Sequence, residues 1–252
     1  SCEDWNGGNG GIIFFRASGE VTGSGTIDAS GKGYRGGGCG ACGNHAWGIQ
    51  GEGIAGTGSA SLENNVNGGG GGYGPSGYNG EPGAGGGHGS VGIIGDSSHG
   101  FDTEGGSVVG DVTFTHIFMG GGGGGGGDHD NRDPDPIGGD GGGIVIVATP
   151  SISIGNINSK GNDGVCNQIS GGGSSGAGAG GSIYLLTSSD QTVNMNVSGG
   201  LGCSDGQSDQ SGDGGNGRIF SLKIGCTDFD NSNSGIFESV TLEYDDLDTT
   251  GE

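Results

Sequence analysis

The chain has 252 residues, of which 72 are glycine, and 7 Lys+Arg against 29 Asp+Glu give it a formal net charge of -22 at pH 7. This acidity argues against nucleic acid or an anionic membrane as a partner, because binding to phosphate needs a basic surface. With only 28% hydrophobic residues, the composition alone is typical of a disordered chain. The apolar residues are nevertheless clustered in compact runs and the glycines are partly periodic, which predicts an ordered, repetitive fold.

A repeated pattern, in which glycine precedes an apolar run, marks the predicted strands. The apolar runs occupy residues 12–15, 144–147, 182–186 and 218–222. A second, weaker strand follows each of the first three runs, at residues 25–29, 152–157 and 193–197. The second and third copies superpose with a shift of 38 residues, which aligns Gly143 with Gly181. The sequence therefore predicts stacked copies of one structural unit.

The first strand of each copy is apolar at consecutive positions, which predicts burial on both faces. The second strand alternates and predicts one exposed face. Helices usually cover a doubly buried sheet, but no segment here has helical periodicity, and glycine opposes helix formation. Another kind of segment must therefore cover these strands.

Glycine recurs at every third position from Gly71 to Gly95. A period of three matches polyproline-II geometry, in which one side of an extended left-handed helix must be small enough for close packing. We therefore expect polyglycine-II helices to pack together within one chain, and the eight consecutive glycines at residues 120–127 would belong to them. The alternative interpretation of these tracts is a flexible linker.

Two apolar segments lie outside the repeat. Residues 108–119 predict a strand or a pair of short strands. Residues 236–244 alternate as a half-buried strand does, and we expect this strand to pair with a neighbouring subunit through Ile236, Val240, Leu242 and Tyr244.

These elements together predict an all-β fold, a solenoid-like or sandwich stack of short strands packed with polyglycine-II segments and essentially without α-helix. We expect residues 1–244 to form one glycine-rich repeat domain and residues 245–252 to form an acidic, mobile tail. No stretch approaches the roughly 18 apolar residues of a membrane-spanning helix, so we expect no insertion into a membrane.

The chain has six cysteines, an even number in a protein with little apolar core: Cys2, Cys39, Cys42, Cys166, Cys203 and Cys226. This favours disulfides, an oxidising compartment and a secreted, extracellular or cell-surface location. A start at Ser1 without an apolar leader suits a mature product. Cys166 and Cys203 follow the terminating glycines of adjacent copies, so stacking predicts a bridge between them, and Cys2 with Cys226 is a weaker expectation. A zinc or redox site at Cys39 and Cys42 is the alternative to a disulfide.

An acidic segment after the eight glycines offers oxygen ligands for a hard cation. Its carboxylates stand at near-alternate spacing, as Asp128, Asp130, Asp133 and Asp135. Calcium gathers ligands in this way, although no cofactor is required by anything else in the sequence. The alternative is an acidic loop that is merely solvated. Asn196 begins a glycosylation sequon, Asn-Val-Ser.

Signals for catalysis are poor, and we expect the protein not to be an enzyme. Residues 172–176 match the spacing of a nucleophile elbow but lack its strand-to-helix context. The histidines show no ligand spacing: His45, His88, His99, His116 and His129.

Several glycine motifs resemble the glycine-rich repeat regions of large uncharacterised prokaryotic surface proteins. These motifs lie at residues 31–37, 50–53, 118–120, 142–146 and 180–185, together with Asn67 and its glycine tract. The resemblance spans roughly residues 10–222 and implies a surface or adhesive location. A weaker similarity is to the tail-fibre-tip adhesins of T-even-like phages, in which it implies stacked polyglycine-II helices.

From these features we expect an extracellular structural subunit that assembles with copies of itself into a filament or surface layer. The alternative is a surface adhesin or binding module that displays Tyr34, Trp47, Tyr73 and Tyr78 to a glycan or receptor, because aromatic rings stack on sugars. A remote alternative is an ice-binding protein, since flat arrays of polyglycine-II helices occur in some antifreeze proteins.

Overall fold

The computed structural model describes residues 1–38, 46–74, 80–111, 113–128, 136–166, 172–189, 191–203 and 209–223. Within these residues the chain forms β-strands and no helix, which confirms the prediction of an all-β chain for this part of the sequence. The described residues contain no helix of the length and hydropathy needed to cross a bilayer.

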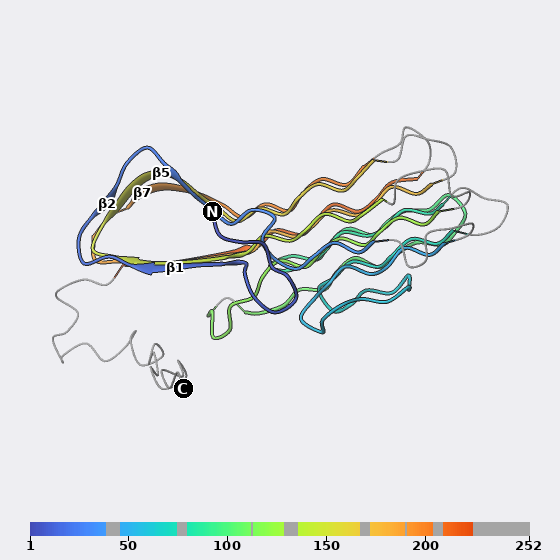
Figure 1. The fold of residues 1–252 in the computed structure, drawn as a ribbon, viewed down its shortest axis with the longest axis horizontal. Helices are drawn as coiled ribbons and strands as arrows, with labels where there is room; N and C mark the ends of the chain where they lie inside the picture. Colours follow the sequence, from blue (N-terminus) through green and yellow to red (C-terminus); the bar gives the residue numbers. More distant parts are fainter. Residues whose placement is uncertain are drawn as a thin grey trace.

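The strands form two four-stranded parallel sheets. The first sheet has the order β1 (Ile12–Arg16), β4 (Ile144–Thr149), β6 (Ser182–Thr187) and β8 (Arg218–Lys223). In the second sheet β5 (Ile152–Asn158) pairs with β2 (Val21–Thr22), β3 (Thr26–Asp28) and β7 (Thr192–Asn196). The chain enters the first sheet, turns, and leaves through the second, so successive units stack on one another (Figure 1).

The register of the sheets agrees with the predicted repeat. Ile144 pairs with Ser182 and Val145 with Ile183, which is the expected shift of 38 residues. The apolar core lies between the two sheets, where Val145, Ile183 and Leu185 of the first sheet pack in one cluster with Ile152 and Ile157 of the second. All five side chains are at most 1% exposed.

Burial of the first strands on both faces is confirmed for β4 and β6 but is wrong for β1 and β8. The last two alternate between half-buried and exposed residues, because they are the edges of the first sheet. Phe14 on β1 is 65% exposed and Ile219 on β8 is 40% exposed.

The predicted strand at residues 108–119 is also wrong for the described part of that segment, which contains no strand. Its backbone turns at Gly110 (φ 70°) and Phe114 (φ 56°), conformations that a strand does not adopt. The ring of Phe114 packs instead on Tyr184 and Phe220, with centroids 6.0 and 5.3 Å apart. This segment therefore covers part of the outer face of the first sheet, where the sequence suggested glycine segments.

Beyond the sheets the chain runs back and forth as extended, glycine-rich segments that lie side by side (Figure 1). Residues 120–127 form the central segment of this bundle, and all of them are buried. Every third amide of the central segment donates a hydrogen bond to the same neighbour. Gly121, Gly124 and Gly127 donate to the carbonyls of Gly87, Ala84 and Glu81, with N–O distances of 3.2, 2.8 and 2.9 Å.

The other amides of the central segment follow the same rule with two more neighbours, residues 46–52 and residues 136–142. The carbonyls of the central segment in turn accept hydrogen bonds from residues 34–37, 69–72 and 173–179. The central segment thus has six hydrogen-bonded neighbours, and all of its amides are paired although they are buried, as a stable interior requires.

This packing leaves no space for side chains at the centre. An added Cβ at Gly121 would lie 1.7 Å from the carbonyl oxygen of Asn67, and one at Gly124 would lie 1.9 Å from that of Gly70. The glycines are therefore required by the close approach of neighbouring backbones.

Candidate functional site

The described residues that flank several chain reversals meet at the end of the bundle remote from the sheets, which we call the loop end (Figure 1). Ala46 pairs with Asp128, and Asp128 pairs with Gly172. The bundle thus brings residues from distant parts of the sequence to one end of the molecule.

The predicted disulfide between Cys166 and Cys203 is confirmed, with an S–S distance of 2.02 Å, and it lies at this end. The amide of Gly164 donates to the carbonyl of Leu201 (2.9 Å), so the two segments are already paired next to the bridge. Cys2 is half-buried and is a free thiol among the described residues. Cys39, Cys42 and Cys226 lie outside them, so their pairing stays a prediction.

The structure describes only one of the four proposed calcium ligands. Asp128 is 4% exposed, and its backbone belongs to the bundle. Asp130, Asp133 and Asp135 lie outside the described residues, as do all four residues of the proposed assembly strand, Ile236, Val240, Leu242 and Tyr244. Asn196 is exposed at the end of β7, and its side chain accepts a hydrogen bond from the amide of Ser198 (2.9 Å).

Three aromatic rings gather at the loop end from three separate segments. The rings of Trp47 and Tyr73 have centroids 4.4 Å apart, and those of Tyr73 and Phe101 have centroids 5.1 Å apart. Trp47 is 37% exposed. Trp47 and Tyr73 were expected as display residues from the sequence, and Phe101 was not. Tyr34 lies elsewhere, with its ring against Trp5 (6.1 Å), and Tyr78 is outside the described residues.

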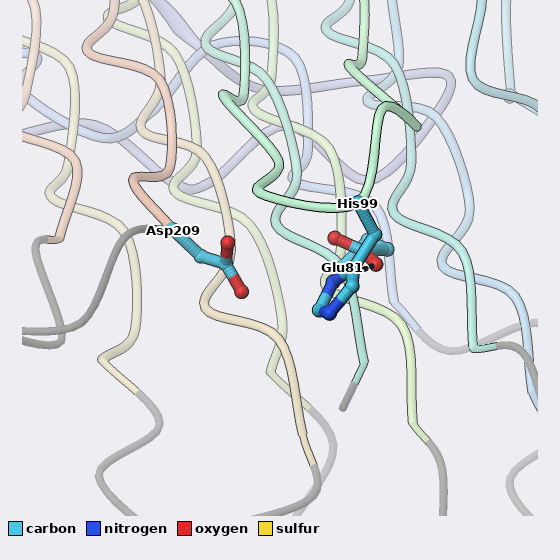
Figure 2. A group of neighbouring side chains, drawn as sticks. All are labelled: Glu81, His99 and Asp209. Carbon is cyan, nitrogen blue, oxygen red and sulfur yellow. Dashed lines mark ion pairs between the residues drawn. The ribbon is translucent and has the colours of Figure 1, made fainter. Parts of the chain in front are cut away.

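A cluster of titratable groups lies next to these rings: Glu81, His99 and Asp209 (Figure 2). Its ligand-type atoms all lie within 4.8 Å of one another. His99 Nδ1 is 3.0 Å from Glu81 Oε1. The amide of Glu81 donates to the carbonyl of Tyr73 (2.7 Å), which connects this cluster to the aromatic one.

Backbone pairing holds the three groups in place. Residues 95–103 form a tight reversal in which Gly95 and Thr103 pair, and this reversal carries His99. Asp96 pairs with Gln210 through two hydrogen bonds of 2.8 and 3.0 Å, which sets Asp209 beside it. Asp209 Oδ1 also accepts a hydrogen bond from the amide of Ser98 (2.7 Å).

The carboxylate of Glu81 is the unusual group of this cluster. Its side chain is 0% exposed, and burial raises its pKa above the ordinary value. Ser97 and His99 oppose this effect, whereas the charge of Asp209 adds to it. Neither oxygen accepts a hydrogen bond of good geometry. Buried polar groups are rarely left in this condition.

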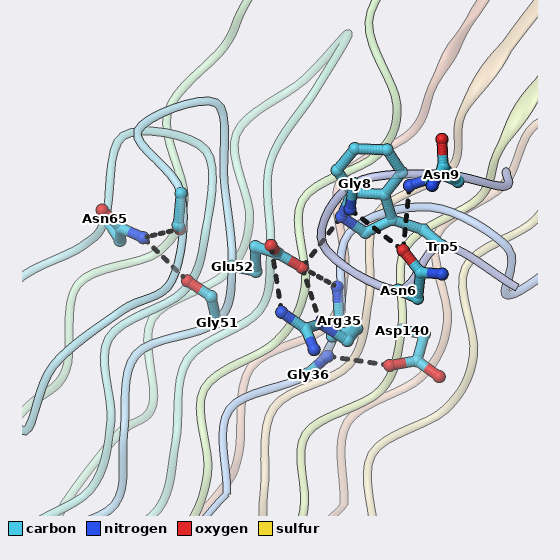
Figure 3. Close-up of polar contacts among 11 residues, drawn as sticks. Trp5, Asn6, Gly8, Asn9, Arg35, Gly36, Gly51, Glu52, Asn65 and Asp140 are labelled. Carbon is cyan, nitrogen blue, oxygen red and sulfur yellow. Dashed lines mark hydrogen bonds and ion pairs between the residues drawn. The ribbon is translucent and has the colours of Figure 1, made fainter.

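A second buried carboxylate, Glu52, lies at the other end of the bundle and is fully satisfied (Figure 3). It accepts hydrogen bonds from Trp5 Nε1 (3.1 Å), Arg35 N (3.1 Å) and Arg35 Nε (3.0 Å). Burial raises the pKa of Glu52, but these bonds outweigh it and hold the pKa below its usual value. Nearby, Asp140 accepts a hydrogen bond from the amide of Gly36 (2.8 Å). These contacts explain a structural role for Glu52 and do not form an open site.

Sequence reasoning missed the cluster of Glu81, His99 and Asp209. No local spacing marks it, because the three residues belong to three segments that only the bundle brings together. The one available signal was a histidine flanked by polar residues in a glycine-rich region.

The chain matches no family model, no curated protein and no solved structure. The resemblance to glycine-rich surface proteins and phage adhesins therefore stays a prediction.

Proposed function

We propose that the protein is an extracellular binding module, in which a bundle of polyglycine-II type holds a rigid recognition surface at the loop end. The bonding of every third amide to one neighbour supports this assignment of the bundle, since three residues form one turn of that helix. The stacked strands at the other end would act as a sandwich-like base. A rigid scaffold that carries binding groups at its chain reversals is a common arrangement for recognition.

The observation that carries this proposal is the cluster of Trp47, Tyr73 and Phe101. Aromatic side chains present large, rigid apolar faces and suit stacking on sugars or on apolar groups of a receptor. The exposed part of Trp47 makes it the expected contact residue. The scarcity of basic residues favours a neutral or cationic ligand over an anionic one.

A screen of the full, oxidised chain on a glycan array, followed by titration of any hit, tests the proposal. We expect Trp47→Ala to weaken binding at least about tenfold, as the loss of an aromatic anchor does. Phe14→Ser is the matched control, because it removes an exposed aromatic ring at the opposite end and should leave binding unchanged. Equal binding by the Trp47→Ala variant, or no glycan ligand at all, would count against a glycan-binding surface.

A structural subunit is the second candidate, and the two outer strands of the first sheet, as the described residues show it, favour it. β1 and β8 are opposite edges of one parallel sheet, and both carry exposed apolar residues, such as Ile12 (50%), Phe14 (65%) and Ile219 (40%). Pairing of the β8 edge of one copy with the β1 edge of the next would be head-to-tail and would grow into a filament.

Sedimentation velocity and electron microscopy across pH and calcium concentration test this candidate. Filaments that are lost in the Phe14→Ser variant would support it. Monomers under every condition would exclude assembly by this route and by the predicted strand at residues 236–244.

A further inference from the structure

We propose that Glu81, His99 and Asp209 bind a divalent first-row transition-metal ion, with zinc as the expected ion, and that this ion ties three segments of the loop end together. The proposal does not depend on which molecule the aromatic cluster binds.

The spacing of the three groups suits coordination. In a tetrahedral zinc site with ligand bonds of about 2.0–2.1 Å, neighbouring ligand atoms lie about 3.3 Å apart. His99 Nδ1 and Glu81 Oε1, at 3.0 Å, are already close to this separation. The largest separation in the cluster is within 4.8 Å, so Asp209 needs a side-chain shift of only about 1.5 Å to complete a site with such bond lengths.

The condition of Glu81 independently indicates a missing cation. A carboxylate that is fully buried and accepts no well-formed hydrogen bond is costly to keep in a folded protein. Its ion-pair partner His99, at 3.0 Å, carries a charge only when protonated, and Asp209 places a second negative charge in the same cluster. A bound metal ion would supply both the missing partners and the opposing charge.

The orientation of Asp209 leaves it able to take part. Its Oδ1 is bound to the amide of Ser98 (2.7 Å), which fixes the carboxylate while a second oxygen remains available as a ligand. In Figure 2 the carboxylate of Asp209 and the ring of His99 point toward each other. Hydrogen-bonded carboxylate ligands of this kind are usual in metal sites.

The ligand types favour zinc over calcium. Calcium takes six to eight oxygen ligands, whereas this cluster offers one imidazole nitrogen and two carboxylates, a set that suits zinc and its neighbours in the first transition row. Three protein ligands leave a fourth position for water or for an oxygen atom of a bound molecule. The site is distinct from the calcium ligands that the sequence suggested, of which only Asp128 is described.

Calorimetric titration of the full, oxidised chain with zinc sulfate tests the proposal, with calcium chloride as a parallel titration. We expect one zinc ion per chain. His99→Ala and Asp209→Asn should each weaken zinc binding at least about tenfold, since loss of even an outer-shell partner typically costs 10–100-fold. His116→Ala is the control, because this exposed histidine lies elsewhere, stacked on Phe118, and its loss should leave affinity unchanged.

Cobalt binding gives a second measurement that does not depend on affinity alone. The cobalt-loaded chain should have the visible spectrum of an ion bound by one imidazole nitrogen and by oxygen ligands. This spectrum should disappear in the His99→Ala variant. Both replaced side chains are partly accessible to solvent, so these variants should fold. Thermal unfolding of each variant without metal checks this, and its Tm should equal that of the native chain. Absence of zinc binding, zinc binding that is unchanged in both ligand variants, or a response to calcium alone would overturn the proposal.

Discussion

The replacement of Gly124 by alanine tests whether the central segment is packed as tightly as the structure shows. An added Cβ at this position would lie 1.9 Å from the carbonyl oxygen of Gly70, whereas ordinary van der Waals contact begins at 3.4 Å. The two segments would have to separate by about 1.5 Å to reach an ordinary contact. Such a shift would break the two bonds that join these segments, from the amide of Gly69 to the carbonyl of Gly122 (2.9 Å) and from the amide of Gly72 to the carbonyl of Gly125 (2.8 Å).

The expected cost follows from these bonds. Each lost backbone bond is worth about 1 kcal/mol, and a buried group left unpaired costs about 1–3 kcal/mol more. We therefore expect Gly124→Ala to lower the free energy of unfolding by about 3–6 kcal/mol. For a domain of this size that corresponds to a fall of about 6–24 °C in Tm.

Differential scanning calorimetry of the oxidised chain measures this difference, with Gly38→Ala as the matched control. Gly38 also belongs to the bundle, but an added Cβ there would have nothing within 4 Å. We expect the control to change stability by less than about 1 kcal/mol, with slight stabilisation because alanine restricts the unfolded chain. Equal Tm values for the two variants would refute the close packing of the central segment.

Three further predictions concern the cross-link and two buried titratable groups. Replacement of both Cys166 and Cys203 by serine should lower the free energy of unfolding by about 4 kcal/mol in urea, because the bridge closes a loop with a sequence separation of 37; an unchanged midpoint would contradict this. Burial lowers the pKa of His88 to about 4, below the value of about 6.5 in an unfolded chain. The neutral His88 should therefore contribute about 3 kcal/mol to the free energy of unfolding above pH 6.5, and this contribution should be lost as the pH falls toward 4. A His88→Gln variant whose stability falls as steeply with pH as that of the native chain would contradict this. Glu52→Gln should cost about 1–3 kcal/mol at pH 7 through its charged hydrogen bonds, whereas the exposed Glu63→Gln should change little; equal urea midpoints for the two would show that the bonds to Glu52 contribute nothing.

The strands could be predicted from the sequence because each apolar run has its own local signal. The run predicted at residues 152–157 is β5 (Ile152–Asn158), and the shift of 38 residues recurs in the pairing of β4 with β6. The same repeat placed Cys166 beside Cys203. The periodic glycines favoured close packing of segments without side chains, but the neighbours of residues 120–127 could not be predicted, because glycine segments carry no side chains that specify a partner.

Other features depend on tertiary contacts, which have little or no local signal in the sequence. The apolar run of β1 gave no sign that it would lie at an edge, where Phe14 is exposed. Residues 108–119 have the composition of a strand, but turns at Gly110 and Phe114 and the contact with Tyr184 outweigh that preference. The cluster of Glu81, His99 and Asp209 is formed entirely by tertiary contacts, and its only signal in the sequence was a histidine flanked by polar residues.

Hydrogen exchange of the oxidised chain, followed by mass spectrometry, tests directly whether glycine backbone forms the solid interior of the molecule. The amides of residues 120–127 are buried and bonded to three neighbouring segments, so they should exchange only when the whole domain unfolds, as slowly as those of β4 and β6. Exchange of these glycine amides at the rate of an unstructured peptide, while the strands stay protected, would contradict the account.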